Sequence, residues 1–493
     1  GESWDVSYEP LGMFGTNSAL IEVSSLPPLN LEQRLQYLIR YPHGCIEQTT
    51  SSVFAQLYLD ELISLDDERK LQIEKNINAA IERLKLFQTA SGGFAYWPGQ
   101  SDANDWGTNY AGHFLLEARK KGFAVSEGLI NSLIVFQSKK ANNWSRIDKY
   151  SAELNQAYRL YMMALAGEPM LGAMNRLKAQ TELTHVAKWK LALAYATAGY
   201  KDIANELIQG LSKDVVSYKG SHRTYGSKNR DKAIILETLA RLDKVEDAYD
   251  ILVQISEEMG NKDKWMSTQT TAYCLIGIAT YSQGNQKSPD LNFSANIGST
   301  VASYEKGKYV TQLAIEEADK KAPINLKNNG DTPIYTRLVR NGIPLEGNEV
   351  ERSKNISMKI NYKDLDGNIL NVSSIEQGTD FIAEVMIHNP GTKGNYNEIA
   401  LTQIFPSGWE ILNTRLDNTS QYYKQEKPEY TDIRDDRVLM YFDIKANERK
   451  TFVVRLNASY QGKYYLPSIS LEAMYDNSIY ANSTGKWVSV VGQ

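Results

Sequence analysis

The chain has 493 residues, 42% of them apolar and 23% charged, which is typical of a folded protein with more than one core. Its net charge is −5 at pH 7 with both signs mixed along the chain, so the sequence offers no basic field for nucleic acid. No run of about 18 apolar residues occurs, so the sequence predicts no membrane span.

The first residues, GESWDVSYEPLG, lack the pattern of a signal peptide, and we expect the chain to be part of a longer protein. The stretch NSALIEVSSLPPL, at 17–29, alternates apolar and polar side chains as a strand does. These N-terminal residues are too few to fold alone. We therefore expect them to pair with strands from elsewhere in the chain.

Helical periodicity dominates from about residue 29 to residue 284, where apolar side chains recur at i, i+3, i+4 and i+7. The segments with this pattern are 31–41, 46–63, 71–88, 110–122, 154–167, 185–199, 232–244, 245–259 and 268–283. Repeated helical hairpins either stack as an open solenoid or close into a ring. The connector FQTASGGFAYWPG, at 87–99, combines glycines with aromatic residues and resembles connectors of α/α-toroid domains, which favours the ring.

From about residue 286 the period changes to two, with turn residues between the segments. The alternating segments are 310–318, 334–341, 356–364, 380–389, 438–445, 451–459 and 468–475. DLDGN, at 364–368, is interpreted as a hairpin turn, because the later ligands and final glutamate of a calcium loop are missing. We expect 286–345 to be a short β region that pairs with the N-terminal strands, and 346–493 to be an antiparallel sandwich.

The two cysteines, Cys45 and Cys274, are too few for a disulfide framework. Cys274 lies in the apolar stretch TTAYCLIGIAT and is predicted to be a packing residue. Cys45 precedes Gln48 by about one helical turn, so the two side chains point the same way. Their condensation with loss of ammonia would leave an internal thioester. An amine or hydroxyl would attack the Gln48 carbonyl and expel Cys45 as a thiolate.

The segment GCIEQ, preceded by YP and followed by TTS, resembles the thioester motif of the alpha-2-macroglobulin family, most closely that of its bacterial members. Further similar segments lie at 22–44, 92–99, 110–122, 335–344, 434–438 and 472–475. The resemblance therefore spans nearly the whole chain and implies the C-terminal part of such a protein.

The implied fold class is multidomain, with separate α and β parts. An α/α-toroid thioester domain, at 28–285, is expected as an insertion into a CUB-like β domain formed by 1–27 and 286–345. A receptor-binding-like macroglobulin β-sandwich is expected at 346–493.

The resemblance implies a protease inhibitor rather than an enzyme. In the family, a protease cuts a bait region, and the exposed thioester then couples to a surface lysine amine of that protease in a single turnover. The implied partners are target proteases and the remaining N-terminal macroglobulin domains of the full-length chain, and no cofactor is implied. Bacterial members are typically periplasmic or held at the cell envelope, often by a lipid anchor, and defend the cell against foreign proteases.

The resemblance also implies side chains that keep water from the thioester. Tyr41 lies four residues before Cys45 and is the first candidate shield. Met474 and Tyr475, in EAMY, are the corresponding candidates in the C-terminal domain.

Complement relatives use a histidine to divert the acyl group toward hydroxyls. His113 lies within a helical stretch, and we interpret it as structural. His43 could tune Cys45, although a solvated histidine is the simpler interpretation. Glu47 faces away from the Cys45 and Gln48 side and is assigned no chemistry. We therefore expect direct reaction with amines.

Three other interpretations remain open. A cysteine hydrolase would need Cys45 beside a base such as His43 or His113, and the sequence does not mark that arrangement. A toroid enzyme would need an acidic cluster or zinc ligands, and SLDDER, at 64–69, is interpreted as a capped, solvated helix start. The third is a thioester-inactive structural or docking module of a larger surface protein.

Overall fold

The computed structural model of the chain divides into two compact units, Gly1–Ile343 and Pro344–Gln493. The described residues are 2–25, 29, 44–63, 65, 67–145, 152–215, 224–261, 266–284, 291–298, 300–304, 309–331, 333–343, 350–412 and 426–492. Among these residues, no helix combines the length and the apolar character that crossing a lipid bilayer requires.

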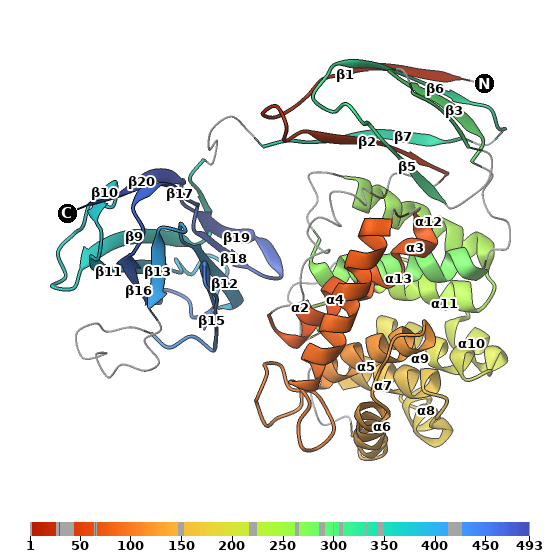
Figure 1. Cartoon of the computed structure of the whole chain (residues 1–493). Helices are drawn as coiled ribbons and strands as arrows, with labels where there is room; N and C mark the ends of the chain where they lie inside the picture. The colour runs from red at the N-terminus through yellow and green to blue at the C-terminus, as the bar shows by residue number, and fades with distance from the viewer. Residues whose placement is uncertain are drawn as a thin grey trace. The chain divides into compact units, whose positions relative to one another are not determined.

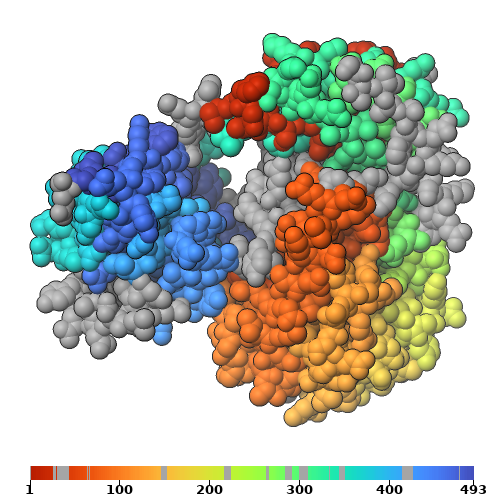
Figure 2. All heavy atoms as spheres, in the orientation of Figure 1, coloured from red at the N-terminus to blue at the C-terminus, as the bar shows by residue number. Residues whose placement is uncertain are grey.

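The β part of the first unit consists of two sheets, with strand orders β1-β6-β3-β4 and β5-β2-β7 (Figure 1). The strands are β1 Ser3–Tyr8, β2 Ser18–Ser24, β3 Phe293–Ile297, β4 Thr300–Tyr304, β5 Val310–Ala314, β6 Ala322–Asn328 and β7 Tyr335–Asn341. Apolar side chains from both sheets, among them Ile21, Val23 and Phe293, form one core. The N-terminal strands thus pair with strands after residue 290, as their alternating pattern predicted, and Figure 2 shows these red and green segments side by side.

The helical region lies between β2 and β3 and is therefore an insertion in this β structure. Its inner helices are α2 Ile46–Gln56, α5 Asp105–Lys120, α7 Ala152–Leu165, α9 His185–Thr197, α11 Lys228–Arg241 and α13 Thr268–Gly284. Each inner helix contacts the next, and α13 contacts α2. The helices therefore close into an α/α toroid rather than an open solenoid.

Outer helices cover this ring (Figure 1). They are α3 Leu59–Leu62, α4 Asp67–Lys85, α6 Glu127–Asn142, α8 Leu171–Lys178, α10 Lys201–Ile208 and α12 Val245–Gly260. The helix α4 packs against α2 and α5, and α6, α8 and α12 likewise each pack against two inner neighbours. The inner helix α5 buries every residue from Trp106 to Ala118, whereas α12 buries only one face, as expected for inner and outer positions.

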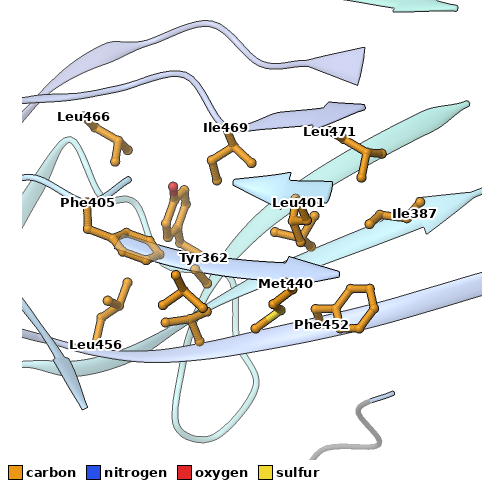
Figure 3. Packing of buried hydrophobic residues seen from close by; sticks show 14 of the residues in the cluster. Tyr362, Ile387, Leu401, Phe405, Met440, Phe452, Leu456, Leu466, Ile469 and Leu471 are labelled. Carbon is orange, nitrogen blue, oxygen red and sulfur yellow. The ribbon is translucent and has the colours of Figure 1, made fainter. Parts of the chain in front are cut away.

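The second unit is a β-sandwich. Its strands are β8 Arg352–Lys354, β9 Ser357–Asp364, β10 Ser374–Glu376, β11 Asp380–His388, β12 Tyr396–Ile404, β13 Trp409–Leu412, β14 Tyr430–Ile433, β15 Arg437–Ile444, β16 Arg449–Ala458, β17 Gly462–Leu466, β18 Ser470–Ala473, β19 Asp476–Asn482 and β20 Lys486–Val491. They form the sheets β13-β16-β11-β9, β14-β15-β12-β18-β19-β8 and β10-β20-β17. Apolar side chains such as Leu401, Phe452 and Leu471 converge between the strands in one core (Figure 3).

One strand pair departs from the antiparallel expectation. The strand β10 runs parallel to β20, with Ser374 opposite Ser489. The predicted turn at 364–368 is confirmed, because the Asn368 N–H donates to Asp364 Oδ1 over 2.8 Å and a bridge joins Lys363 to Ile369 beyond it. No group of three His, Cys, Asp or Glu side chains suited to a metal occurs in the part of the chain that the structure describes.

Candidate functional site

Cys45 and Gln48 meet at the N-terminus of α2. Cys45 is fully buried and caps the helix with an extended backbone, φ −70° and ψ 173°. Gln48 is the third helical residue, and its Oε1 accepts a hydrogen bond from the Cys45 backbone N–H over 3.3 Å. The Gln48 side chain therefore folds back toward Cys45 in a capping-box arrangement, and the two residues lie together as the spacing predicted.

Gly44 leaves the space that this fold-back needs. Its φ is +87°, a conformation that residues with side chains rarely adopt. A Cβ on Gly44 would lie 2.0 Å from Gln48 Oε1 and 3.0 Å from Gln48 Cδ. The Gln48 carboxamide thus occupies the place where any other residue would put its side chain.

Other elements hold the first turn of α2 in place. The Ile46 N–H donates to the Tyr96 carbonyl in the aromatic connector over 3.0 Å. Arg83, near the end of α4, donates from Nη2 to the Gly44 carbonyl over 3.1 Å and from Nε to Thr49 Oγ1 over 3.4 Å. The backbone on both sides of Cys45 is therefore tied to neighbouring elements.

The helix α5 approaches α2 closely at Gly107. A Cβ on Gly107 would lie 2.5 Å from Ile46 Cγ2, so a larger residue would displace the first turn of α2. Asn104 caps α5 here, because its Oδ1 accepts from the Gly107 N–H over 2.7 Å. The sequence interpretation missed Gly107, and the available signal was a glycine near the start of a helical segment.

Glu47 is fully buried, which the sequence interpretation did not anticipate. Its Oε1 accepts from Ser51 Oγ over 2.7 Å and from Thr268 Oγ1 on α13 over 3.5 Å. Ser51 Oγ also lies 3.0 Å from Tyr110 Oη on α5. Burial, and next the charge of Glu47, raise the pKa of Tyr110 well above its usual value. Glu47 thus ties α2 to both inner neighbours.

His113 lies inside the ring, enclosed by aromatic side chains. Its Nδ1 lies 3.1 Å from Tyr158 Oη, and its ring makes edge contacts with Phe54 and Tyr161. Burial, followed by the positive charge of Lys190, lowers the pKa of His113 well below its usual value. These contacts are those of a core residue and agree with the structural interpretation.

A buried ion pair lies beside this aromatic core. Lys190 Nζ on α9 is 3.4 Å from Glu237 Oε2 on α11, and both side chains are buried. Burial lowers the pKa of Lys190 to about 8, although Glu237 opposes the shift. The pair joins two neighbouring inner helices of the ring.

The remaining candidate residues are Tyr41, His43, Met474 and Tyr475. Tyr41 and His43 lie outside the described residues. Met474 and Tyr475 form the turn between β18 and β19 in the second unit, where the Met474 N–H donates to the Glu398 carbonyl over 3.0 Å. The shielding roles of all three candidates therefore stay predictions.

Cys274 and the segment SLDDER have the structural roles that the sequence interpretation gave them. Cys274 is fully buried in α13, with Sγ 3.9 Å from the Asn229 carbonyl, as a packing residue would be. Within SLDDER, Asp67 begins α4 and is exposed, while Ser64 and Asp66 lie outside the described residues.

The sequence of the chain was compared with protein families and with known proteins. Residues 18–146 match the model of the A-macroglobulin TED domain, and residues 347–477 match the bacterial alpha-2-macroglobulin MG10 domain. The alpha-2-macroglobulin of Xylella fastidiosa is 26% identical in an alignment that covers 93% of this chain. The chain belongs to the bacterial alpha-2-macroglobulin family. It spans 29% of the length of the Xylella relative, so it corresponds to one part of such a protein.

Solved alpha-2-macroglobulin structures share the fold. The Escherichia coli protein from domain MG7 to the C-terminus matches 99% of this chain and 81% of its own, with a TM-score of 0.80 and 21% identity. Salmonella alpha-2-macroglobulin reacted with methylamine matches 99% of this chain and 33% of its own, with a TM-score of 0.82 and 22% identity.

Proposed function

We propose that Cys45 and Gln48 form an internal thioester, and that this chain is the C-terminal part of an alpha-2-macroglobulin that couples covalently to attacking proteases. The observation that supports it most directly is the Gln48 Oε1 contact to the Cys45 N–H, beside a glycine with no room for a side chain.

The chemistry proceeds in two balanced steps. In the first, the Cys45 sulfur replaces the amide nitrogen on Gln48 Cδ, and ammonia leaves. In the second, an amine attacks the same carbon, the new C–N bond replaces the C–S bond, the sulfur departs with the electron pair, and the amine loses a proton to solvent. The acyl oxygen is the Gln48 Oε1 that already accepts the Cys45 N–H, so this donor would stabilise its developing charge.

The surroundings favour storage of such a bond. Cys45 is fully buried, and exclusion of water slows hydrolysis of an acyl group. His113 contacts Tyr158 within the ring, so the proposal gives it no part in the reaction. Direct attack by an amine is therefore the proposed route, and a surface lysine of a protease is the proposed nucleophile.

The wider role follows the family. We propose a thioester domain at 28–285, a CUB-like domain from 1–27 and 286–345, and a macroglobulin domain at 346–493. Tyr41, Met474 and Tyr475 are proposed as shields of the thioester. A place in the periplasm or cell envelope, and N-terminal macroglobulin domains as partners, complete the proposal.

Intact mass measurement tests the thioester. Loss of ammonia lowers the mass by about 17 Da, and methylamine, the reagent named for the Salmonella structure, should then add to Gln48 and release one thiol. We expect the Cys45→Ala variant to show neither effect and the Cys274→Ala variant to show both.

A native protein with the full sequence mass and no methylamine labelling would contradict the proposal and favour a docking module. Repeated turnover of a substrate would instead indicate a cysteine hydrolase.

A further inference from the structure

We propose that Arg83 is a positioning residue for the thioester, which stabilises the Cys45 thiolate by fixing a positive charge beside the N-terminus of α2. The inference deepens the proposed function and rests on it for the reaction itself. Its electrostatic part can be tested on the Cys45 thiol whether or not the thioester forms.

Three contacts fix the Arg83 guanidinium. Nη2 donates to the Gly44 carbonyl over 3.1 Å and Nε donates to Thr49 Oγ1 over 3.4 Å. Cζ lies 5.7 Å from the centre of the Phe87 ring, within the range of a cation–π contact. One acceptor directly precedes Cys45 and the other follows it by one helical turn, so the charge is held next to the sulfur-bearing residue.

The carboxylate next to Arg83 on α4 is paired with another residue. On α4 itself, the adjacent carboxylate of Glu82 pairs with Lys85, 2.6 Å away. Among the described residues, no carboxylate forms an ion pair with Arg83.

The other titratable groups near Cys45 come from the elements packed against it. Glu47, on α2 itself, accepts from Ser51 and from Thr268 of α13. Tyr110 of α5 reaches the same site through Ser51, and Tyr96 of the connector accepts from Ile46 with its backbone carbonyl. Glu47 would disfavour a nearby thiolate, and the positive charge of Arg83 would oppose that effect.

The thiolate occurs in both steps of the proposed chemistry. It is the nucleophile when the thioester forms and the leaving group when an amine opens it. The helix N-terminus favours a negative charge there, and a fixed guanidinium adds to that effect. Arg83 is therefore expected to influence formation and reaction alike without touching the incoming amine.

The experiment uses the full chain on a Cys274→Ala background, opened with methylamine so that Cys45 carries a thiol. The rate of alkylation by iodoacetamide is measured against pH, which reports the thiol pKa. We expect Arg83→Gln to raise that pKa by about one unit and Arg83→Lys to restore most of it, because a cation within a few ångströms shifts an acid by this much. The methylamine reaction of the closed form should slow about threefold in Arg83→Gln.

Lys75→Gln is the matched control. Lys75 is exposed and lies eight residues before Arg83 on α4, so the variant removes the same charge from the same helix about 12 Å away. Its thiol pKa should equal that of the parent.

Two results would overturn the inference. An unchanged thiol pKa in Arg83→Gln, with only lower stability, would make Arg83 a packing residue against Phe87. An equal rise in Arg83→Lys and Arg83→Gln would exclude the charge as the cause. If the parent lacks the loss of about 17 Da, the proposed function fails, but alkylation of uncondensed Cys45 still decides the role of Arg83.

Discussion

Gly44 is the single residue on which the geometry of the candidate thioester most depends. A side chain there meets two separate costs, the strain of a φ of +87° and a collision with Gln48 Oε1 at 2.0 Å. Gly122 allows the strain to be measured without the collision. Its φ is +94°, but no atom lies within 4 Å of the position that a Cβ would take. The strain alone costs about 1–2 kcal/mol.

We expect Gly44→Ala to abolish thioester formation, because the new methyl group takes the position of the Gln48 carboxamide. The loss of about 17 Da in intact mass should disappear, whereas Gly122→Ala should keep it. Urea denaturation should show a loss of about 1–2 kcal/mol of unfolding free energy from backbone strain in Gly122→Ala, and a larger loss in Gly44→Ala because of the added collision. A Gly44→Ala protein that still loses ammonia would contradict the role assigned to this glycine.

The sequence predicted the pair and its orientation but not its supports. One helical turn separates Cys45 from Gln48, so local geometry suffices to bring them together. Arg83 and Tyr96 reach the same turn from other elements, and nothing in their own segments indicates that contact. Their positions depend on closure of the ring, which periodicity alone does not specify.

At the scale of elements, the helical pattern identified the helical segments but not how deeply each helix is buried. Outer helices such as α12 have the one apolar face that periodicity detects, whereas α5 is buried all round and includes polar residues. His113 on α5 is hydrogen-bonded within the ring, and so is the buried Glu47 on α2. The parallel β10–β20 pair was also missed, because alternation gives the same pattern for either strand direction.

Stability of the helical ring should fall in acid because of His113 on α5. In the unfolded chain a histidine binds its proton below about pH 6.5, but burial lowers the pKa of folded His113, so acid favours the unfolded state. The stability that this group contributes is complete above pH 6.5 and decreases as pH falls toward the folded pKa. The limit for one proton is about 1.4 kcal/mol per pH unit.

We expect His113→Phe to flatten this dependence while preserving the ring contacts with Phe54 and Tyr161. Urea denaturation at pH 7.5 and pH 5.5, followed by far-UV circular dichroism, would measure the difference for each protein. The parent should lose more unfolding free energy between the two pH values than the variant does. Equal losses would show that His113 does not control the acid response.

At the scale of the whole molecule, contacts between distant segments define the architecture. The N-terminal β2 pairs with β5 and β7, so the helical ring can fold as an insertion between strands of one β structure. The alternating pattern of both segments made this pairing predictable, because neither end could cover its apolar face alone. Partner strands and register could not be derived, since several segments share the same period.

The second unit has its own core, so we expect it to lose stability independently of the helical ring. Phe381 is fully buried on β11, and its ring centre lies 4.9 Å from that of Trp409 on β13. Phe381→Ala should cost the second unit about 3–5 kcal/mol through lost burial and the cavity left behind. Hydrogen exchange in the full chain should therefore accelerate at least about a hundredfold in the slowest peptides of 350–492. Peptides of the helical ring should be unaffected.

Phe114→Ala, at a fully buried position of α5, is the matched variant and should show the reverse distribution of exchange. Because this variant removes the same kind of side chain from the core of the helical ring, we expect a similar loss of unfolding free energy in the first unit. Faster hydrogen exchange in both units of either variant would mean that the two units unfold together as one cooperative body. The division between residues 343 and 344 would then separate two compact units that do not differ in their unfolding.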